Sequence, residues 1–185
     1  MDIHLELLNE SDFNTIVNWI NHRDQDFMVQ WSGLTYTFPL TVEQMQSHYH
    51  KGINSLDSDV FIYKIVEITS NEMIGSLQLC RFDSMKKEAV ICRFIIGDSS
   101  RRGSGIGTLA LKKAVQIGFT QFGLKQIRLN VFDINNTAIR CYERVGFKKG
   151  KMTENAYTSS QGVQWSNLEM ILDKEIWEKN VPVSE

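Results

Sequence analysis

The stretch that decides the fold is the glycine-rich segment Arg102-Gly103-Ser104-Gly105-Ile106-Gly107. It follows the apolar run Ala89 to Ile96, which is typical of a buried central strand, and it precedes apolar residues at helical spacing. Three alternating glycines let the backbone approach a ligand closely and leave amide N–H groups unpaired at a helix N-terminus. The pattern predicts a phosphate-binding turn, whereas a plain strand-to-helix turn needs only one glycine.

Two nucleotide-binding families share part of this pattern. Gly105 to Ala110 fits the G-x-G-x-x-A dinucleotide fingerprint. However, residues 97–101 separate it from the strand, and the acidic residue expected about 20 positions later is missing. An NAD-dependent oxidoreductase is therefore a weak alternative. No Gly-Lys-Ser/Thr follows the glycines, which excludes a P-loop NTPase.

A second motif lies downstream, where residues 135–147 read Asn-Asn-Thr-Ala-Ile-Arg-Cys-Tyr-Glu-Arg-Val-Gly-Phe. This segment resembles the Asn-x-x-Ala-Ile-x-x-Tyr-x-x-x-Gly-Phe sequence of the GNAT superfamily of N-acetyltransferases. Arg102-x-x-Gly105-x-Gly107 resembles the Gln/Arg-x-x-Gly-x-Gly/Ala motif of the same family. Both motifs stand in the family's order, with a helix and a strand between them, so the resemblance covers about Ala89 to Phe147.

The resemblance implies that the ligand is acetyl-CoA. Its pyrophosphate would lie on the amides of the glycine-rich segment, with the helix dipole behind them. The strand before the segment and the strand after the helix would splay apart, and the pantetheine arm would pair with the backbone of the first strand. A backbone N–H there would also stabilise the oxyanion of the tetrahedral intermediate. The cofactor-binding residues implied are Ile95, Ile96, Gly97, Arg102, Gly103, Ser104, Gly105, Ile106, Gly107, Thr108 and Asn135.

Two residues of the second motif have both a structural and a functional interpretation. Asn135 is expected to cap the last helix, and the resemblance adds contact with the pantetheine arm. Tyr142 shares a helical face with Ala138 and Val145, as a core tyrosine would. The resemblance implies that its hydroxyl faces the CoA sulfur and protonates the departing thiolate, which makes Tyr142 the catalytic candidate.

The general base is not assigned by the sequence. A free amine is mostly protonated at neutral pH, so a base or a water chain must remove its proton. Several relatives use a glutamate on the strand before the glycine-rich segment, but the aligned position here is Ile91. Glu67, Glu88, Asp98 and His48 are the substitutes considered, and the pattern does not choose among them. The missing glutamate also motivates an alternative, a non-catalytic acetyl-CoA-binding sensor module.

The remaining elements predict one α/β (α+β) domain over residues 1–185, with a mixed, mostly antiparallel central sheet flanked by helices. An antiparallel hairpin with a Ser70-Asn71 turn lies in the middle of the chain, and a polar loop is expected between Thr153 and Gln164. The expected strands are Ile3 to Leu8, Val60 to Ile68, Met73 to Phe82, Ala89 to Ile96, Gln126 to Phe132 and Val163 to Leu172. The expected helices are Asp12 to Ile20, one from about Thr41, one from Gly105 to Gly123, and Asn135 to Val145.

Charge is distributed unevenly along the 185 residues. The whole chain has a net charge of -2, yet residues 101–151 hold 11 basic and two acidic residues, a local net charge of +9. This segment suits an anionic cofactor. A sequence pI of about 6.1 argues against a nucleic-acid partner, for which a basic surface is expected.

Cysteine and hydropathy patterns bear on the compartment. Cys80, Cys92 and Cys141 form no C-x-x-C or metal-ligand spacing, so a reducing, cytoplasmic setting without a metal is expected. A covalent acetyl-cysteine is not favoured, because Cys92 lies in an apolar strand. No signal peptide, spanning helix or membrane partner is expected. The apolar residues Ile176 and Trp177 near the C-terminal end indicate either a homodimer interface or packing against the sheet.

The acceptor is expected to bind between the early helices and the loop after residue 153. The region Phe13 to Tyr49 is rich in aromatic residues and includes Asp24 and Asp26, which could receive a cationic amine. An aromatic core under the helices explains the same residues equally well. This part broadly resembles GNAT members that acetylate ribosomal-protein N-termini or polyamines. The predicted acceptor is therefore a primary amine, either a small amine or a peptide N-terminus.

Overall fold

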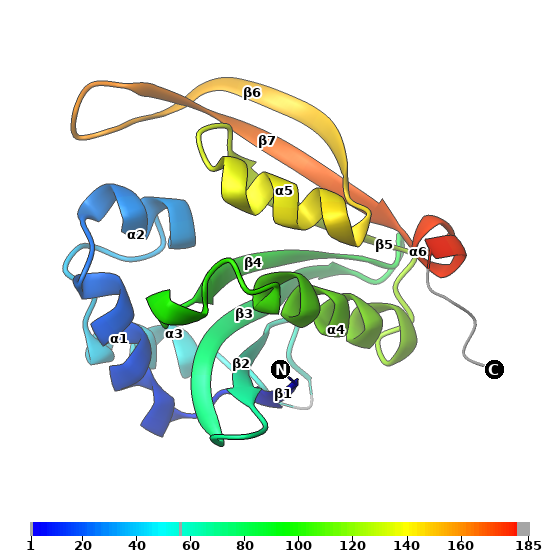
Figure 1. Cartoon of the computed structure of the whole chain (residues 1–185), viewed down its shortest axis with the longest axis horizontal. Coiled ribbons are helices and arrows are strands. Elements are labelled where there is room, and N and C mark those ends of the chain that lie inside the picture. Colours follow the sequence, from blue (N-terminus) through cyan, green and yellow to red (C-terminus); the bar gives the residue numbers. More distant parts are fainter. Residues whose placement is uncertain (1, 56, 181–185) are drawn as a thin grey trace.

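The computed structural model describes residues 2–55 and 57–180, and its described part contains one seven-stranded sheet (Figure 1). The strand order is β1-β2-β3-β4-β5-β7-β6. Only β4 and β5 pair in parallel, and every other neighbouring pair is antiparallel. The predicted mixed, mostly antiparallel sheet is confirmed. The strands are β1 (Ile3–Leu7), β2 (Phe61–Glu67), β3 (Glu72–Asp83), β4 (Glu88–Ile96), β5 (Gln126–Phe132), β6 (Lys148–Thr158) and β7 (Gln164–Asp173).

Helices cover both faces of this sheet. On one face of the sheet lie α4 (Ile106–Thr120) and α5 (Asn136–Val145), whose apolar side chains belong to the larger core. On the other face lie α1 (Phe13–Asn21), α2 (Gln25–Ser32) and α3 (Val42–Tyr49), whose apolar side chains form a second core. The predicted amphipathic pattern of α1 is confirmed, because Phe13, Ile16 and Ile20 are buried. Short elements complete the order: η1 (Glu10–Asp12), η2 (Ser99–Arg101) and α6 (Lys174–Asn180). None of the helices in residues 2–55 and 57–180 is long and apolar enough to cross a membrane.

Several elements differ from the sequence prediction. The prediction of a polar loop from Thr153 to Gln164 is wrong for its first part, because residues 153–158 belong to β6. Nearly all of β6 is solvent-exposed, so it lacks the alternation that marks a half-buried strand, and its pairing with β7 holds it in place. Helix α4 ends at Thr120 rather than at Gly123. In α6, the Trp177 ring lies 5.5 Å from the Phe119 ring, which decides in favour of packing against the core.

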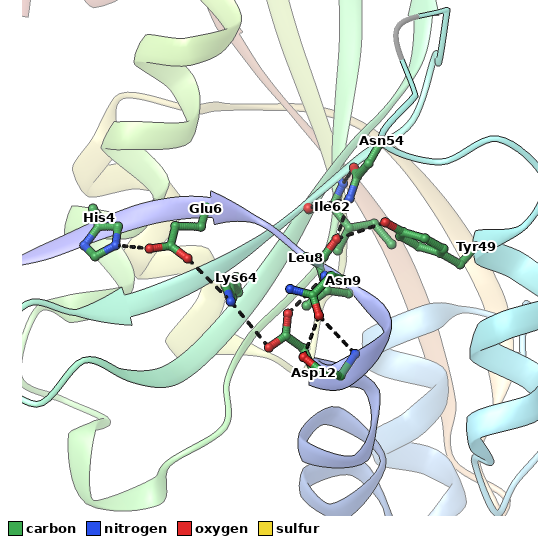
Figure 2. A network of polar contacts seen from close by, with 10 residues as sticks. His4, Glu6, Leu8, Asn9, Asp12, Tyr49, Asn54, Ile62 and Lys64 are labelled. Atoms are coloured by element: carbon green, nitrogen blue, oxygen red, sulfur yellow. Dashed lines mark hydrogen bonds and ion pairs between the residues drawn. The ribbon is translucent and has the colours of Figure 1, made fainter.

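A polar network fixes the first helices against the sheet (Figure 2). The ammonium of Lys64 on β2 lies 3.4 Å from Glu6 on β1 and 3.5 Å from Asp12 at the start of α1. The hydroxyl of Tyr49 on α3 donates to the Leu8 carbonyl, and the Asn54 amide donates to the same oxygen. These contacts link β1, β2, α1 and α3, so the helical layer beside β4 has a defined position.

Candidate functional site

The site is built on the strand β4, where two irregularities meet. First, β4 pairs with β5 only from Glu88 to Ile91, so the two strands separate beyond this point, as the resemblance implied. Second, β4 has one extra residue opposite β3 between Cys92 and Ile95, and Arg93 there has a left-handed φ of 48°. A β-bulge of this kind redirects the strand that follows. The free edge of β4 therefore begins at the bulge.

Of the three strand residues predicted to pair with the pantetheine arm, the structure turns one toward the free edge. The Gly97 N–H donates to the Ile74 carbonyl of β3 at 2.9 Å, and the Ile95 carbonyl also points at β3, close to Gly75. Because successive backbone groups of a strand point to opposite edges, the N–H and carbonyl of Ile96 point away from β3. Ile95 and Gly97 thus flank the free edge, and Ile96 supplies its backbone groups.

The glycine-rich loop presents unpaired amides at the start of α4. Gly103 and Gly105 have φ values of 80° and 90°, which only glycine adopts without strain, and an added Cβ at either position would meet open space. Gly105 is the N-cap of α4 and offers no side chain for capping. Within the described chain, the N–H groups of residues 103–108 have no hydrogen-bond partner. Such a cradle of free N–H groups at a helix N-terminus fits a phosphate.

Two arginines hold this loop in position. The guanidinium of Arg101 pairs with the carboxylate of Glu67, which is 3% exposed at the end of β2, and it also contacts Asp98 at 3.3 Å. Arg102, the first residue of the motif, donates to the carbonyls of Ile96 and Gly97 at 3.0 and 3.4 Å. Its guanidinium therefore contacts the strand end that the pantetheine arm was expected to pair with, while the amides remain open.

Helix α5 places the remaining predicted residues on the same side of the sheet. The Asn135 side chain accepts from the Ala138 N–H at 3.1 Å, which confirms the predicted N-cap. The Thr108 hydroxyl lies 3.5 Å from the Cys141 sulfur and links α4 to α5. Tyr142 is 9% exposed, and its hydroxyl has no hydrogen-bond partner in the described residues. Burial raises the pKa of Tyr142 above its ordinary value, so the hydroxyl stays protonated and able to donate.

The four substitutes considered for the general base are found in different settings. Glu67 pairs with Arg101, and Glu88 pairs with Arg128 where β4 begins. Asp98 caps η2, and its hydrogen bonds with Ser100 lower the pKa of that carboxyl. His48 lies in a cavity on the far face of the sheet, and its Nε2 is buried without a partner. Each carboxylate thus has a structural partner, and Ile91 is buried against α4, so its side chain faces away from that cavity.

The far face of the sheet carries contacts that no local sequence pattern marked. The Trp31 indole of α2 donates to the Arg93 carbonyl at the bulge, which fixes α2 over β4. Asp26 accepts from the Tyr157 hydroxyl at 2.8 Å and from Ser160, so the tip of the β6–β7 hairpin reaches α2 (Figure 1). The hydrogen bonds from Ser160 lower the pKa of Asp26. Asp24 is the N-cap of α2 and accepts from the Phe27 N–H at 2.8 Å, so both predicted acceptor carboxylates are already engaged by the protein.

Comparison with known proteins agrees with this geometry. The family model described as "Acetyltransferase (GNAT) domain" matches residues 2–148. Aminoglycoside N(6')-acetyltransferase type 1 of Klebsiella pneumoniae is 24% identical over 156 residues, 80% of this chain and 74% of that protein. An uncharacterized prophage-derived N-acetyltransferase of Bacillus subtilis is 22% identical over 144 residues, 77% of each chain. The crystal structure of Vibrio cholerae spermidine N-acetyltransferase in complex with CoA and spermine superposes with a TM-score of 0.80 at 18% identity, covering 95% of this chain and 98% of that one.

The chain belongs to the GNAT acetyltransferase family, since the family match spans most of its length. It is an acetyl-CoA-dependent N-acetyltransferase. The dehydrogenase alternative does not fit, because a dinucleotide-binding sheet is mostly parallel and this sheet has a single parallel pair. Residues 2–55 and 57–180 contain no group of three or more His, Cys, Asp or Glu side chains that could hold a metal ion.

Proposed function

We propose that the chain transfers the acetyl group of acetyl-CoA to a primary amine, a small amine or a peptide N-terminus, by direct attack in a ternary complex. The observation that carries this proposal is the uncapped N-terminus of α4, with its unpaired amides, beside the free edge of β4. The amides of residues 103–108 would bind the pyrophosphate, and the backbone of Ile96 would pair with the pantetheine arm. Asn135, at the start of α5, would contact the same arm.

The chemistry needs two contributions from the chain. The neutral amine attacks the thioester carbonyl, and a backbone N–H at the free edge of β4 stabilises the developing oxyanion. The Tyr142 hydroxyl donates its proton to the departing thiolate, a role supported by its lack of a hydrogen-bond partner in the described residues. The amine must lose a proton before it attacks. Because the three carboxylates considered as bases are engaged elsewhere, we propose that this proton leaves through water.

A tyrosine-to-phenylalanine pair of variants tests this assignment. Tyr142→Phe removes only the hydroxyl, and we expect turnover to fall by about ten-fold or more, with little change in acetyl-CoA affinity by calorimetry. Thiol release with a panel of amines measures the turnover. Tyr49→Phe is the matched control, because it removes a hydroxyl that donates to Leu8, in the network of Figure 2. Unchanged turnover in Tyr142→Phe would show that Tyr142 is not the acid.

The same assay separates the proposed enzyme from the alternatives. Release of thiol with at least one amine supports acetyl transfer. Tight acetyl-CoA binding without turnover on any amine would instead indicate a sensor. We further propose a cytoplasmic location, from the cysteine pattern, and self-association, since one similar spermidine N-acetyltransferase structure is described as dodecameric. Light scattering on the purified chain measures its oligomeric state.

A further inference from the structure

Two of the three cysteines lie side by side on the far face of the sheet. Cys80 is on β3 and Cys92 is on β4, and the register pairs Gln78 with Cys92 and Cys80 with Val90. The two cysteines are therefore diagonal neighbours with side chains on one face, and their sulfur atoms are 2.8 Å apart. A disulfide bond has a sulfur–sulfur distance of about 2.05 Å, so bond formation requires only a small movement.

The thiol pair is reached through a cavity between α2, α3 and the sheet. The cavity has a volume of about 210 Å³, and both cysteines line it, together with Trp31, His48 and Arg93. Hydrogen peroxide is little larger than water, so a cavity of this size admits it. Neither cysteine is one of the residues proposed to bind acetyl-CoA or to protonate the leaving thiolate, which lie at the start of α4, at the free edge of β4 and on α5.

A positive charge without an acidic partner lies beside the pair. The Arg93 guanidinium donates to Gln78 and Thr35, and one of its terminal nitrogens lies 3.9 Å from the Cys92 sulfur. It forms no ion pair within the described part of the chain, and its Nε is buried without a partner. A buried guanidinium is stabilised by a nearby anion, and a thiolate on either sulfur of the pair would provide one.

The two thiols differ in their readiness to ionise. The hydrogen bond with Cys92 lowers the pKa of Cys80, and the guanidinium groups of Arg93 and Arg81 act in the same direction. The same hydrogen bond, together with burial, raises the pKa of Cys92 well above its usual value. Either sulfur can donate in this contact, and the opposite directions of the two pKa shifts favour Cys80 as the nucleophile of the pair.

We propose that Cys80 and Cys92 form a reversible disulfide when the protein meets a peroxide. The Cys80 thiolate attacks one peroxide oxygen, the O–O bond breaks, and hydroxide leaves while Cys80 becomes a sulfenic acid. The Cys92 sulfur then attacks the Cys80 sulfur. The S–O bond breaks, and the sulfenic oxygen leaves as water with the thiol proton. Overall, two thiols lose two electrons and two protons, and one peroxide becomes two waters. A dithiol reductant reverses the bond by exchange.

The test is a thiol count on the wild-type protein, which does not depend on acetyl transfer. The reduced protein is treated with hydrogen peroxide, free thiols are alkylated under native and denaturing conditions, and peptides are mapped by mass spectrometry. We expect one intramolecular Cys80–Cys92 peptide pair, Cys141 left as the alkylated residue, and full recovery with dithiothreitol. Disulfide-linked dimers through Cys141, or three alkylated cysteines after peroxide treatment, would overturn the proposal.

Serine variants identify the order of events. Cys92→Ser leaves the nucleophile without its partner, so we expect a sulfenic acid at Cys80 that dimedone traps. Cys80→Ser removes the nucleophile, so Cys92 should remain a free thiol under the same treatment. Cys141→Ser is the matched control and should form the disulfide as the wild type does. Dimedone labelling at Cys141 instead of Cys80 contradicts the assignment. Melting curves of each variant verify that it is folded, and the wild-type thiol count stands without them.

Discussion

Gly97 is the residue where the first helix meets the end of β4. A Cβ added there would lie 1.9 Å from a ring carbon of Trp19 on α1, so Gly97→Ala must displace the indole or the strand end. Overpacking of this kind costs about 1–3 kcal/mol. We expect a lower free energy of unfolding in urea and a weaker acetyl-CoA affinity by calorimetry, because the adjoining Ile96 backbone shifts as well.

Two further variants control for the change of glycine to alanine. Gly107→Ala places its Cβ 3.6 Å or more from its nearest neighbours, and we expect stability equal to the wild type or slightly higher. Adding Trp19→Ala to Gly97→Ala should restore part of the acetyl-CoA affinity, since the clash is removed. Equal losses of stability in the Gly97 and Gly107 variants would contradict the packing explanation.

His48 makes stability depend on pH. Burial, with smaller effects of Arg93 and Lys51, lowers the pKa of His48 from 6.5 to about 4. The folded protein therefore binds fewer protons than the unfolded chain between these values, so the free energy of unfolding falls as the pH drops through this window. His48→Gln should show a shallower loss between about pH 7 and about pH 5 in urea titrations. His22→Gln, at an exposed position, should keep the wild-type slope, and an unchanged slope in His48→Gln would refute this explanation.

At the scale of elements, the ion pair between Glu67 and Arg101 links the end of β2 to the glycine-rich loop. Glu67→Gln leaves Arg101 without its buried counter-charge, which we expect to cost about 1–3 kcal/mol of stability. The loop loses an anchor, so KM for acetyl-CoA should rise by several-fold while kcat changes little. Steady-state kinetics measure both quantities. Glu72→Gln, an exposed residue at the same turn, should leave KM unchanged, and a fall in kcat alone would argue against a positioning role.

Elements with a strong local pattern were predictable, and those held by tertiary pairing were not. The apolar run of β4, the Thr41 cap of α3 and the left-handed Gly146 after α5 each mark an element in a few residues. By contrast, α2 has a weakly amphipathic sequence, and β6 is almost entirely exposed. These two elements depend on docking through Asp26 and on pairing with β7, which a short window does not contain.

The candidate site divides in the same way. The glycine-rich loop and the Asn135 cap were predictable, because glycine and asparagine have specific backbone roles at those positions. The bulge at Arg93, the free edge at Ile96 and the contact between Cys80 and Cys92 were not. Each of these depends on the register between β3 and β4, and a shift of one residue would move every side chain to the opposite face.

At the scale of the whole molecule, the charge asymmetry of the sequence becomes a basic side of the fold. The segment 101–151 contains 11 basic residues. Three of them, Arg101, Arg128 and Lys149, form ion pairs with carboxylates in the described part of the chain. Most of the others form no ion pair within the described residues. Among them are Lys112 and Lys113 on α4 and Arg140 and Arg144 on α5. The two helices beside the glycine-rich loop therefore carry positive charge that the protein leaves uncompensated, which favours an anionic ligand there.

The positive charge on α4 and α5 predicts that salt weakens the binding of acetyl-CoA, because acetyl-CoA carries phosphates. Raising the ionic strength from about 0.1 M to about 1 M shortens the Debye length from about 10 Å to about 3 Å. We expect acetyl-CoA affinity to fall by about ten-fold over this range, since its phosphates would bind beside the lysines and arginines of α4 and α5. S-acetylpantetheine, which lacks the phosphates, is the matched control and should bind weakly but with little salt dependence. Calorimetric titrations of both ligands measure the difference, and equal salt dependence for the two would show that the basic helices do not act on the phosphates.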